Sequence, residues 1–492
     1  MKKETLIQYF EWYLPEDGRH WTRLANDAPH LKTLGITGAW LPPAYKGIEG
    51  IHDIGYGVYD MYDLGEFDQK GSVCTKYGTK DEFLHAIVAL HQNGLQAYLD
   101  VVFNHRMGAD ATEKVMCRDV DPTDRTNVIS QPREMEVWTK FDFPGRKDQY
   151  SDFKWDWTCF NGTDYTKPDG SRGILLFEGK NWSTHVSQEQ GNFDYIMGDD
   201  ADFSNPRVLE ELYKWGQWFQ RLTHADGYRI DAVKSIDATF FNRWIHEMSR
   251  MIGTDQAFAV GEYWSGDVRK LKEYLDDCSD AMLLFDVPLH FNLQKFSNAQ
   301  GKADLRKVFD NTLFANNPDR SVLFVDNHDT QPGQALQSWV LDWFKPQAYT
   351  LILLRDAKYP MIFYGDLYGI PHDNIQPVPH LSEMIWIRSH LLGEEVTEIQ
   401  SDDPQKLCWS VDSSEGHHPV FVLMTIGDRK SQTVQRDDLA GKSLINIMDL
   451  DHPVLFDENG QAVLSCAPGG MSVFMLPEDY DRMRKDLLSE EQ

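Results

Sequence analysis

Three carboxylic acids stand where separate strand-like runs of the chain end. Asp231, Glu262 and Asp329 each follow a short apolar run. Arg229 precedes Asp231 by two residues, so the two side chains share one face of their strand. Two carboxyl groups flanking one bond are what glycoside hydrolysis requires, one as nucleophile and one as proton donor. The pattern therefore favours an enzyme that cleaves bonds between sugars.

Two imidazoles accompany these acids. His105 ends the run that begins at Asp100, and His328 directly precedes Asp329. Each residue alone has an ordinary structural explanation, since a strand-end aspartate often caps a helix and a lone histidine is often a satisfied core or surface group. Several acids converging beside an arginine would be costly as structure alone, because each charge must be desolvated. Together these residues indicate an active site.

Strand-like and helix-like runs alternate along most of the chain. A capping box formed by Thr79 and Glu82 begins one of the helices. Such alternation is typical of a parallel sheet, and no glycine-rich dinucleotide motif follows an early strand. We therefore predict an α/β fold, a (β/α)8 TIM barrel, whose catalytic groups lie at the carboxyl ends of the strands. The predicted strands lie near residue 6 and over residues 38–41, 96–103, 227–232, 257–262, 282–287, 321–326 and 360–364.

Two segments interrupt or follow this alternation. Residues 104–206 are rich in Trp, Asp, Gly and Asn and are too long for an unstructured loop, so we predict an inserted, irregular or β domain after the third strand. After the barrel segments 1–103 and 207–393, short strands predict a C-terminal antiparallel β-sandwich over residues 394–480. A charged tail, 481–492, ends the chain.

Four segments, in order, carry a resemblance to a known family. They run from Asp100 to His105, from Gly227 to Lys234, from Gly261 to Trp264 and from Phe324 to Asp329. The chain resembles the α-amylases, barrel enzymes that retain anomeric configuration. It is most similar to the bacterial liquefying branch and, within that branch, to intracellular α-amylases. Because all four segments occur together, the resemblance is specific, and it extends over the barrel, the insert and the C-terminal segment.

The resemblance implies a role for each acid. Asp231 attacks the anomeric carbon, and Glu262 protonates the leaving oxygen and then deprotonates water. Asp329 holds sugar hydroxyls and favours ring distortion, while Arg229 keeps the nucleophile ionised. Crowding by the other two acids is expected to raise the pKa of Glu262, as a proton donor near neutral pH requires. The implied reaction is endo-acting hydrolysis of α-1,4-glucosidic bonds in starch, glycogen or maltodextrins.

The resemblance also implies a set of substrate contacts. Tyr56 matches an aromatic platform on which a glucose ring stacks, and Trp12 is a further candidate whose alternative is core packing. The two histidines would hydrogen-bond sugar hydroxyls. The implied substrate-binding residues are Tyr56, His105, Arg229, Lys234, Trp264 and His328.

A calcium site is implied where the insert meets the barrel. Hard oxygen ligands suit Ca²⁺, and one structural ion would clamp the two parts together. Asn161 and Ser183 stand where the liquefying branch carries acids, so we expect one calcium and no larger metal cluster. Ser235 replaces a histidine but keeps the backbone carbonyl expected to bind the ion. The implied ligands are Asn104, Asp194, Asp200 and Ser235.

Composition limits the partners and the compartment. Lys and Arg number 48 against 77 Asp and Glu, a net charge of −29 that disfavours nucleic acids and anionic membranes. The start of the chain lacks the apolar run and cleavage site of a secretory signal, and six scattered cysteines suit a reducing compartment. We expect a cytoplasmic monomer that acts on α-glucans, without an organic cofactor.

Two other functions fit the same residues. An α-glucanotransferase or trehalose-forming enzyme would use the same barrel and acids, with a sugar in place of water as acceptor. The Trp-rich insert and the sequence from Glu262 to Trp264 favour hydrolysis, and products formed with and without added glucose separate the two. A non-catalytic glucan-binding protein would not need all three acids.

Overall fold

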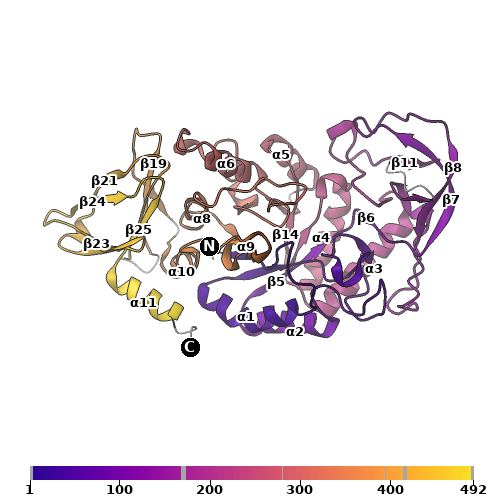
Figure 1. The fold of residues 1–492 in the computed structure, drawn as a ribbon, viewed down its shortest axis with the longest axis horizontal. Coiled ribbons are helices and arrows are strands. Elements are labelled where there is room, and N and C mark those ends of the chain that lie inside the picture. Colours follow the sequence, from indigo (N-terminus) through magenta and orange to yellow (C-terminus); the bar gives the residue numbers. More distant parts are fainter. Residues whose placement is uncertain (1–3, 168–172, 280, 394, 414–417, 489–492) are drawn as a thin grey trace.

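The structure is a computed structural model that describes residues 4–167, 173–279, 281–393, 395–413 and 418–488. The molecule is elongated, with the barrel in the middle, the inserted segment at one end and the C-terminal sheets at the other (Figure 1). Residues 489–492 of the predicted tail lie outside the described residues.

Eight parallel strands close into a barrel, which confirms the predicted fold class. Around the barrel the order is β1, β17, β16, β15, β14, β13, β5 and β2. Each strand lies within one residue of a predicted run or inside it. Their bounds are β1 Leu6–Gln8, β2 Gly38–Leu41, β5 Gln96–Val101, β13 Gly227–Ile230, β14 Phe258–Gly261, β15 Leu283–Phe285, β16 Ser321–Phe324 and β17 Tyr359–Phe363.

Helices cover the outside of the barrel, and their ends follow local capping rules. The hydroxyl of Thr79 accepts a hydrogen bond from the backbone N–H of Glu82, whose side chain accepts one from Thr79, so the predicted capping box is confirmed. Asn205 caps α3, which has Pro206 in its first turn. The helices are α1 His20–Leu34, α2 Lys80–Gln92, α3 Pro206–Thr223, α4 Ala238–Ile252, α5 Val268–Asp277, α6 Val287–Asn298, α7 Leu313–Asn316, α8 Lys345–Leu353, α9 Tyr364–Tyr368, α10 Leu381–Leu391 and α11 Pro477–Leu488.

The segment after β5 forms a sheet of its own, as predicted for the insert. Its strand order is β10, β8, β7, β11, β9, β12 and β6. A short antiparallel pair, β3 Lys46–Gly47 and β4 Val58–Asp60, lies in the barrel loop that precedes α2. The strands of the insert are β6 His105–Arg106, β7 Ala111–Val120, β8 Arg133–Lys140, β9 Phe160–Thr163, β10 Thr166–Lys167, β11 Ile174–Phe177 and β12 Asp199–Ala201.

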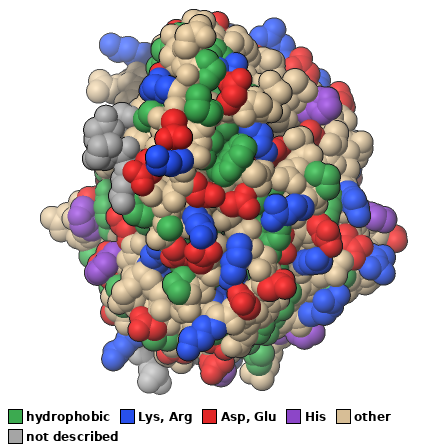
Figure 2. Space-filling model, turned by 90° about the vertical axis from the view of Figure 1, so that its right-hand side faces the viewer, with side chains coloured by type: hydrophobic (Ala, Val, Ile, Leu, Met, Phe, Trp, Pro, Cys, Tyr) green, Lys and Arg blue, Asp and Glu red, His purple; other side chains and the backbone are tan. Residues whose placement is uncertain are grey.

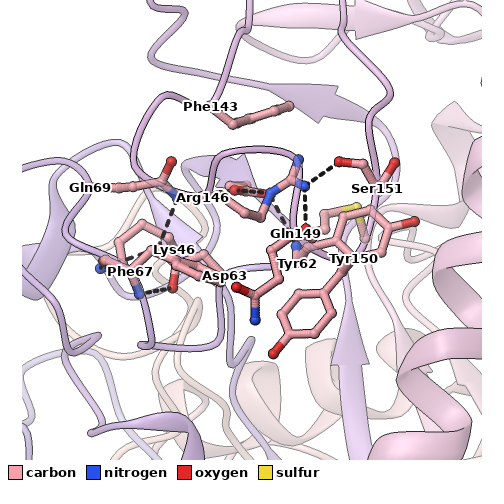
Figure 3. A network of polar contacts seen from close by, with 12 residues as sticks. Lys46, Tyr62, Asp63, Phe67, Gln69, Phe143, Arg146, Gln149, Tyr150 and Ser151 are labelled. Carbon is pink, nitrogen blue, oxygen red and sulfur yellow. Dashed lines mark hydrogen bonds and ion pairs between the residues drawn. The ribbon is translucent and has the colours of Figure 1, made fainter.

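A buried ion pair joins the insert to the barrel. The Nε of Arg146, in the insert, lies 2.8 Å from Oδ2 of Asp60 at the end of β4, and both side chains are 1% exposed. The same guanidinium donates to the carbonyl of Gln149 at 2.6 Å, so it also closes its own loop (Figure 3). Each buried charge needs such a partner, because removal of one residue leaves the charge of the other buried and uncompensated.

Two antiparallel sheets make up the C-terminal part. One has the strand order β18, β19, β20, β25, β22 and β23, and the other pairs β21 with β24. Buried Phe421, Leu464 and Phe474 belong to one apolar cluster between them. The strands are β18 Val396–Glu398, β19 Lys406–Val411, β20 Val420–Thr425, β21 Lys430–Gln435, β22 Ser443–Asn446, β23 Asp449–Leu455, β24 Gln461–Cys466 and β25 Met471–Met475.

The surface and the thiols agree with the composition. On the face that carries the insert, basic and acidic side chains are interspersed (Figure 2). All six cysteines are free. Among the described residues, no helix combines the length and the apolar character needed to cross a bilayer. The domain boundaries assigned from the sequence stay predictions.

Candidate active site

The three predicted acids lie at the same end of the barrel. Asp231 follows β13 by one residue, Glu262 follows β14 by one residue, and Asp329 lies in the loop after β16. Their side chains are 14%, 10% and 24% exposed, so each is largely buried and still reachable from solvent. The carboxyl ends of parallel barrel strands are where catalytic groups gather.

One guanidinium holds two of the acids. Nη1 of Arg229 lies 2.7 Å from Oδ1 of Asp231, and Nη2 lies 3.0 Å from Oε2 of Glu262. Because the two carboxylates bind adjacent nitrogens of one planar group, they are kept close together. Arg229 itself is fully buried. The predicted contact between Arg229 and Asp231 is therefore present in the structure, and the same arginine also reaches the proposed proton donor.

The backbone after Asp231 contributes a further contact to Glu262. Ala232 adopts a left-handed conformation with φ of 47°, which residues other than glycine rarely adopt. Its N–H donates to Oε2 of Glu262 at 3.1 Å. Strained backbone of this kind is often found at functional sites, where the surroundings hold it in place.

Burial raises the pKa of Glu262 and of Asp329 more than the repulsion by neighbouring acids does. The pKa of Glu262 is raised to about 8: burial is the largest cause, Arg229 opposes the rise, and Asp231 and Asp329 add to it. The direction agrees with the sequence prediction, but the prediction named crowding by acids as the cause, and desolvation is the larger one. Burial also raises the pKa of Asp329 to about 7. A carboxyl group protonated near neutral pH can donate a proton to a leaving group.

Tyr56 and the two predicted histidines pack together beside these acids. The rings of Tyr56 and His328 are stacked, with centroids 5.0 Å apart. Nε2 of His105 bonds the carbonyl of Tyr56 at 2.8 Å, and Nδ1 of His328 bonds Nε2 of Gln8 at 2.9 Å. Nε2 of His328 lies 3.3 Å from Asp329. Burial lowers the pKa of both histidines, so each is a neutral ring at neutral pH.

The structure adds Asp100, which was not predicted as a site residue. Its Oδ1 lies 3.1 Å from Nη1 of Arg229, and its Oδ2 accepts hydrogen bonds from Tyr56 at 2.8 Å and from Trp40 at 3.0 Å. The Asp100 side chain is fully buried, so it holds Arg229 rather than substrate. A signal was present in the sequence, since an acid inside an otherwise apolar strand must face a partner.

The other predicted substrate residues lie around these acids. Nζ of Lys234 lies 2.7 Å from Oε2 of Glu189 and donates to the carbonyl of Trp264 at 3.1 Å. Trp264 is partly exposed, and the Trp12 ring stacks on His328 with centroids 6.1 Å apart. A cleft of about 720 Å³ lies beside the acids rather than over them, lined in part by Tyr263, Ser187, Glu189 and Lys270.

Three of the four predicted calcium ligands, Asn104, Asp194 and Asp200, lie near one another. Nδ2 of Asn161 bonds Asp194 at 3.1 Å and Asp200 at 3.2 Å. Burial raises the pKa of both aspartates, that of Asp194 to about 7. In the β6–β12 pairing Asp200 faces His105, so Asn104 lies alongside. Both polar side-chain atoms of Asn104 and the Oγ of Ser235 are buried without a hydrogen-bond partner in the structure.

This donor set fits a hard cation. Asp194 and Asp200 supply carboxylate oxygens. Asn104 supplies a buried amide oxygen that accepts no hydrogen bond from the described residues. In the part of the chain that the structure describes, no group of three or more His, Cys, Asp and Glu side chains is placed to bind a metal. A site here would therefore depend on amide and backbone oxygens as well as on the two acids.

Known proteins share both the sequence and the fold. Residues 21–426 match the family described as alpha amylase, catalytic domain. The chain is 48% identical over 479 residues to an α-amylase of Bacillus licheniformis, covering 96% of this chain and 93% of the relative. It is 39% identical over 495 residues to a cytoplasmic α-amylase of Escherichia coli K12, covering 97% of this chain and 100% of the relative.

A solved structure shows the same fold. The α-amylase of Geobacillus thermoleovorans complexed with acarbose has a TM-score of 0.64 and 20% identity, over 96% of this chain and 98% of that one. A closed barrel with acids at the carboxyl ends of its strands is the arrangement of a barrel glycoside hydrolase. The chain belongs to the α-amylase family.

Proposed function

We propose that the protein is an endo-acting α-amylase that hydrolyses internal α-1,4-glucosidic bonds of starch, glycogen and maltodextrins with retention of anomeric configuration. One observation carries the proposal: a single buried arginine binds both Asp231 and Glu262 at the barrel edge. Retention requires two carboxyl groups close together, one to attack and one to transfer protons. The names of the relatives support the substrate class.

The reaction has two steps. A carboxylate oxygen of Asp231 bonds to the anomeric carbon while that carbon loses its glycosidic oxygen, which takes the proton of Glu262. Glu262, now a carboxylate, then takes a proton from water, whose oxygen replaces Asp231 at the anomeric carbon. The guanidinium of Arg229 lies 2.7 Å from Oδ1 of Asp231 and so orients the attacking carboxyl group. Asp329, whose side chain is the most exposed of the three acids, binds sugar hydroxyls.

Aromatic and neutral polar groups bind the glucan around this centre. Tyr56 offers an aromatic face to a glucose ring, and the neutral rings of His105 and His328 bond its hydroxyls. Lys234 and Trp264 contact neighbouring glucose units, since they lie together beside the acids.

One calcium ion completes the proposal. Asn104, Asp194 and Asp200, with the backbone carbonyl of Ser235, would hold it where the insert meets the barrel. The ion would supply positive charge to two buried carboxylates and so fix the insert beside the cleft. No organic cofactor takes part. The protein acts in the cytoplasm as a monomer; a relative whose name includes "cytoplasmic" and the free cysteines support this location.

Products formed from maltoheptaose test the hydrolytic function. An endo-acting hydrolase releases several shorter maltodextrins, and added glucose does not change their pattern. Chains longer than maltoheptaose, or a pattern that shifts with added glucose, would instead identify a glucanotransferase. A protein that binds glycogen but forms no product would contradict both the hydrolase and the glucanotransferase function.

A further inference from the structure

A lysine lies fully buried between two carboxylates at the barrel edge. Lys345 begins α8, and its side chain is 2% exposed. Its Nζ lies 3.0 Å from Oδ2 of Asp326 and also pairs with Asp366. The ammonium is 3.0 Å from the centre of the Trp339 ring. These charges lie at the exits of β16 and β17, which are neighbouring strands of the barrel.

Asp326 holds the loop that carries Asp329. Its Oδ1 accepts a hydrogen bond from the hydroxyl of Thr330 at 2.8 Å. That hydroxyl accepts one from the backbone N–H of Asn327 at 2.9 Å. The side-chain oxygen of Asn327 in turn accepts from the N–H of Asp329 at 2.9 Å. These bonds close the turn of residues 326–330, which presents His328 and Asp329.

The other carboxylate ties the lysine to the next strand. Oδ2 of Asp366, in α9 at the end of β17, accepts a hydrogen bond from the Tyr349 hydroxyl at 2.6 Å. Tyr349 lies one turn after Lys345 on α8. Lys345 therefore links three elements: the loop after β16, the start of α9 and the first turn of α8.

The charge balance explains why a cation is needed here. Burial raises the pKa of Asp326 to about 7; Lys345 opposes the rise and Asp366 adds to it. Without the ammonium, two buried carboxylates would face each other, and Asp326 would take up a proton. A neutral carboxyl group accepts a weaker hydrogen bond than a carboxylate does, so the bond from Thr330 to Oδ1 of Asp326 would weaken. The turn would then be held less firmly.

We propose that Lys345 is a positioning residue for the hydrolytic reaction: through Asp326 it fixes the 326–330 turn and so places Asp329 and His328 against the sugar. The inference rests on the proposed function, in which Asp329 binds the sugar ring as it distorts. Lys345 touches no substrate, because its ammonium is enclosed by protein.

A second buried lysine provides a matched control. Lys46 is as buried as Lys345 and lies 3.5 Å from Asp63. Its ammonium donates to the carbonyls of Phe67, Ser72 and Val73, which belong to a loop without a proposed catalytic acid (Figure 3 shows Lys46 with Asp63 and Phe67). Removal of either lysine leaves buried hydrogen-bond acceptors without a donor, so both substitutions lower the stability of the fold. Only the change at Lys345 should act on catalysis.

The experiment compares Lys345→Met, Lys46→Met and the double variant Lys345→Met/Asp366→Asn in the full chain, with maltoheptaose as substrate. We expect Lys345→Met to lower kcat about 100-fold, since misplacement of a catalytic group by about 1 Å costs that much. KM should change less than about twofold, as for an interaction made in the transition state. Lys46→Met should keep kcat within about twofold at a similar loss of thermal stability. The double variant, which restores the charge balance, should recover about tenfold in kcat.

A further variant keeps the test decisive if Lys345→Met does not fold. Thr330→Val removes only the hydroxyl bonds to Asp326 and Asn327, and it should lower kcat with KM nearly unchanged. The positioning role is overturned if Thr330→Val keeps full kcat, or if the two lysine variants lose kcat equally. If the parent releases no product from maltoheptaose, or Asp329→Asn keeps full kcat, the proposed function has failed instead.

Discussion

Arg229 organises the acids of this site at the level of single residues. It is fully buried and binds Asp231, Glu262 and Asp100 at once. Two of these acids are partly exposed and Asp100 is not, so the arginine separates the groups that can meet substrate from the one that only supports it. Arginine suits this position because its planar fork binds several carboxylates and stays charged.

The pH dependence of activity follows from Glu262. Its raised pKa, about 8, keeps the acid protonated at neutral pH, so kcat/KM should fall as the pH rises through about 8. The Glu262→Gln variant should lose about 10²–10⁴-fold on maltoheptaose, and much less on a maltoside whose leaving group needs no proton. The control variant Glu210→Gln, at an exposed position of α3, should behave as the parent. Equal losses of Glu262→Gln on both substrates would contradict its role as the acid.

The sequence predicted the exposed part of this site better than its buried support. Asp231, Glu262 and Asp329 could be found because each stands at a strand end and because four motifs occur in order. The support given by Asp100 could not be assigned, since no local pattern says which cation an inward-facing acid meets. The same holds for Gln8, whose contact with His328 joins residues 320 positions apart.

At the level of elements, the ends of the barrel strands position the acids, and the buried ion pair of Arg146 with Asp60 joins the insert to the barrel. The eight barrel strands could be predicted because alternation and capping are local signals. In the C-terminal part β21 is mostly polar and β23 is mostly exposed, so neither shows the alternating apolar pattern of a half-buried strand. The contact of Arg146 with Asp60 was not predictable either, because 86 residues separate the two.

The ion pair between Arg146 of the insert and Asp60 of the barrel gives a prediction about stability. The Arg146→Met variant leaves Asp60 charged and buried, so the free energy of unfolding should fall by about 3–5 kcal/mol. The control is Arg133→Met, also in the insert, whose pair with Asp119 is partly exposed and should contribute about 1 kcal/mol or less. Urea unfolding of both variants measures the difference. Equal effects would show that the buried pair does not join the two parts.

At the level of the whole molecule, a barrel carries an inserted sheet at one end and two C-terminal sheets at the other (Figure 1). Asp194 and Asp200 lie in the insert, and Asp200 belongs to β12, the strand that pairs with β6 directly after the barrel strand β5. A cation there would act on the connection between the parts rather than on the chemistry.

Removal of calcium tests that connection. A chelator should lower the Tm of the parent, because two buried carboxylates lose their counter-charge. The Asp200→Asn variant should begin with a lower Tm in calcium and respond little to the chelator. The exposed acid Glu210 supplies the control, since Glu210→Gln should respond as the parent does. A parent Tm that is the same with and without chelator would show that the cluster holds no calcium.

The most direct test of the account is the stereochemistry of the first product. Proton NMR of the anomeric signals released from maltoheptaose should show the α-anomer first for the parent, as double displacement through Asp231 requires. The Asp231→Asn variant should release no product on the same time scale. Initial β-anomer from the parent, or unchanged turnover in the variant, would contradict the assignment of Asp231 as the nucleophile.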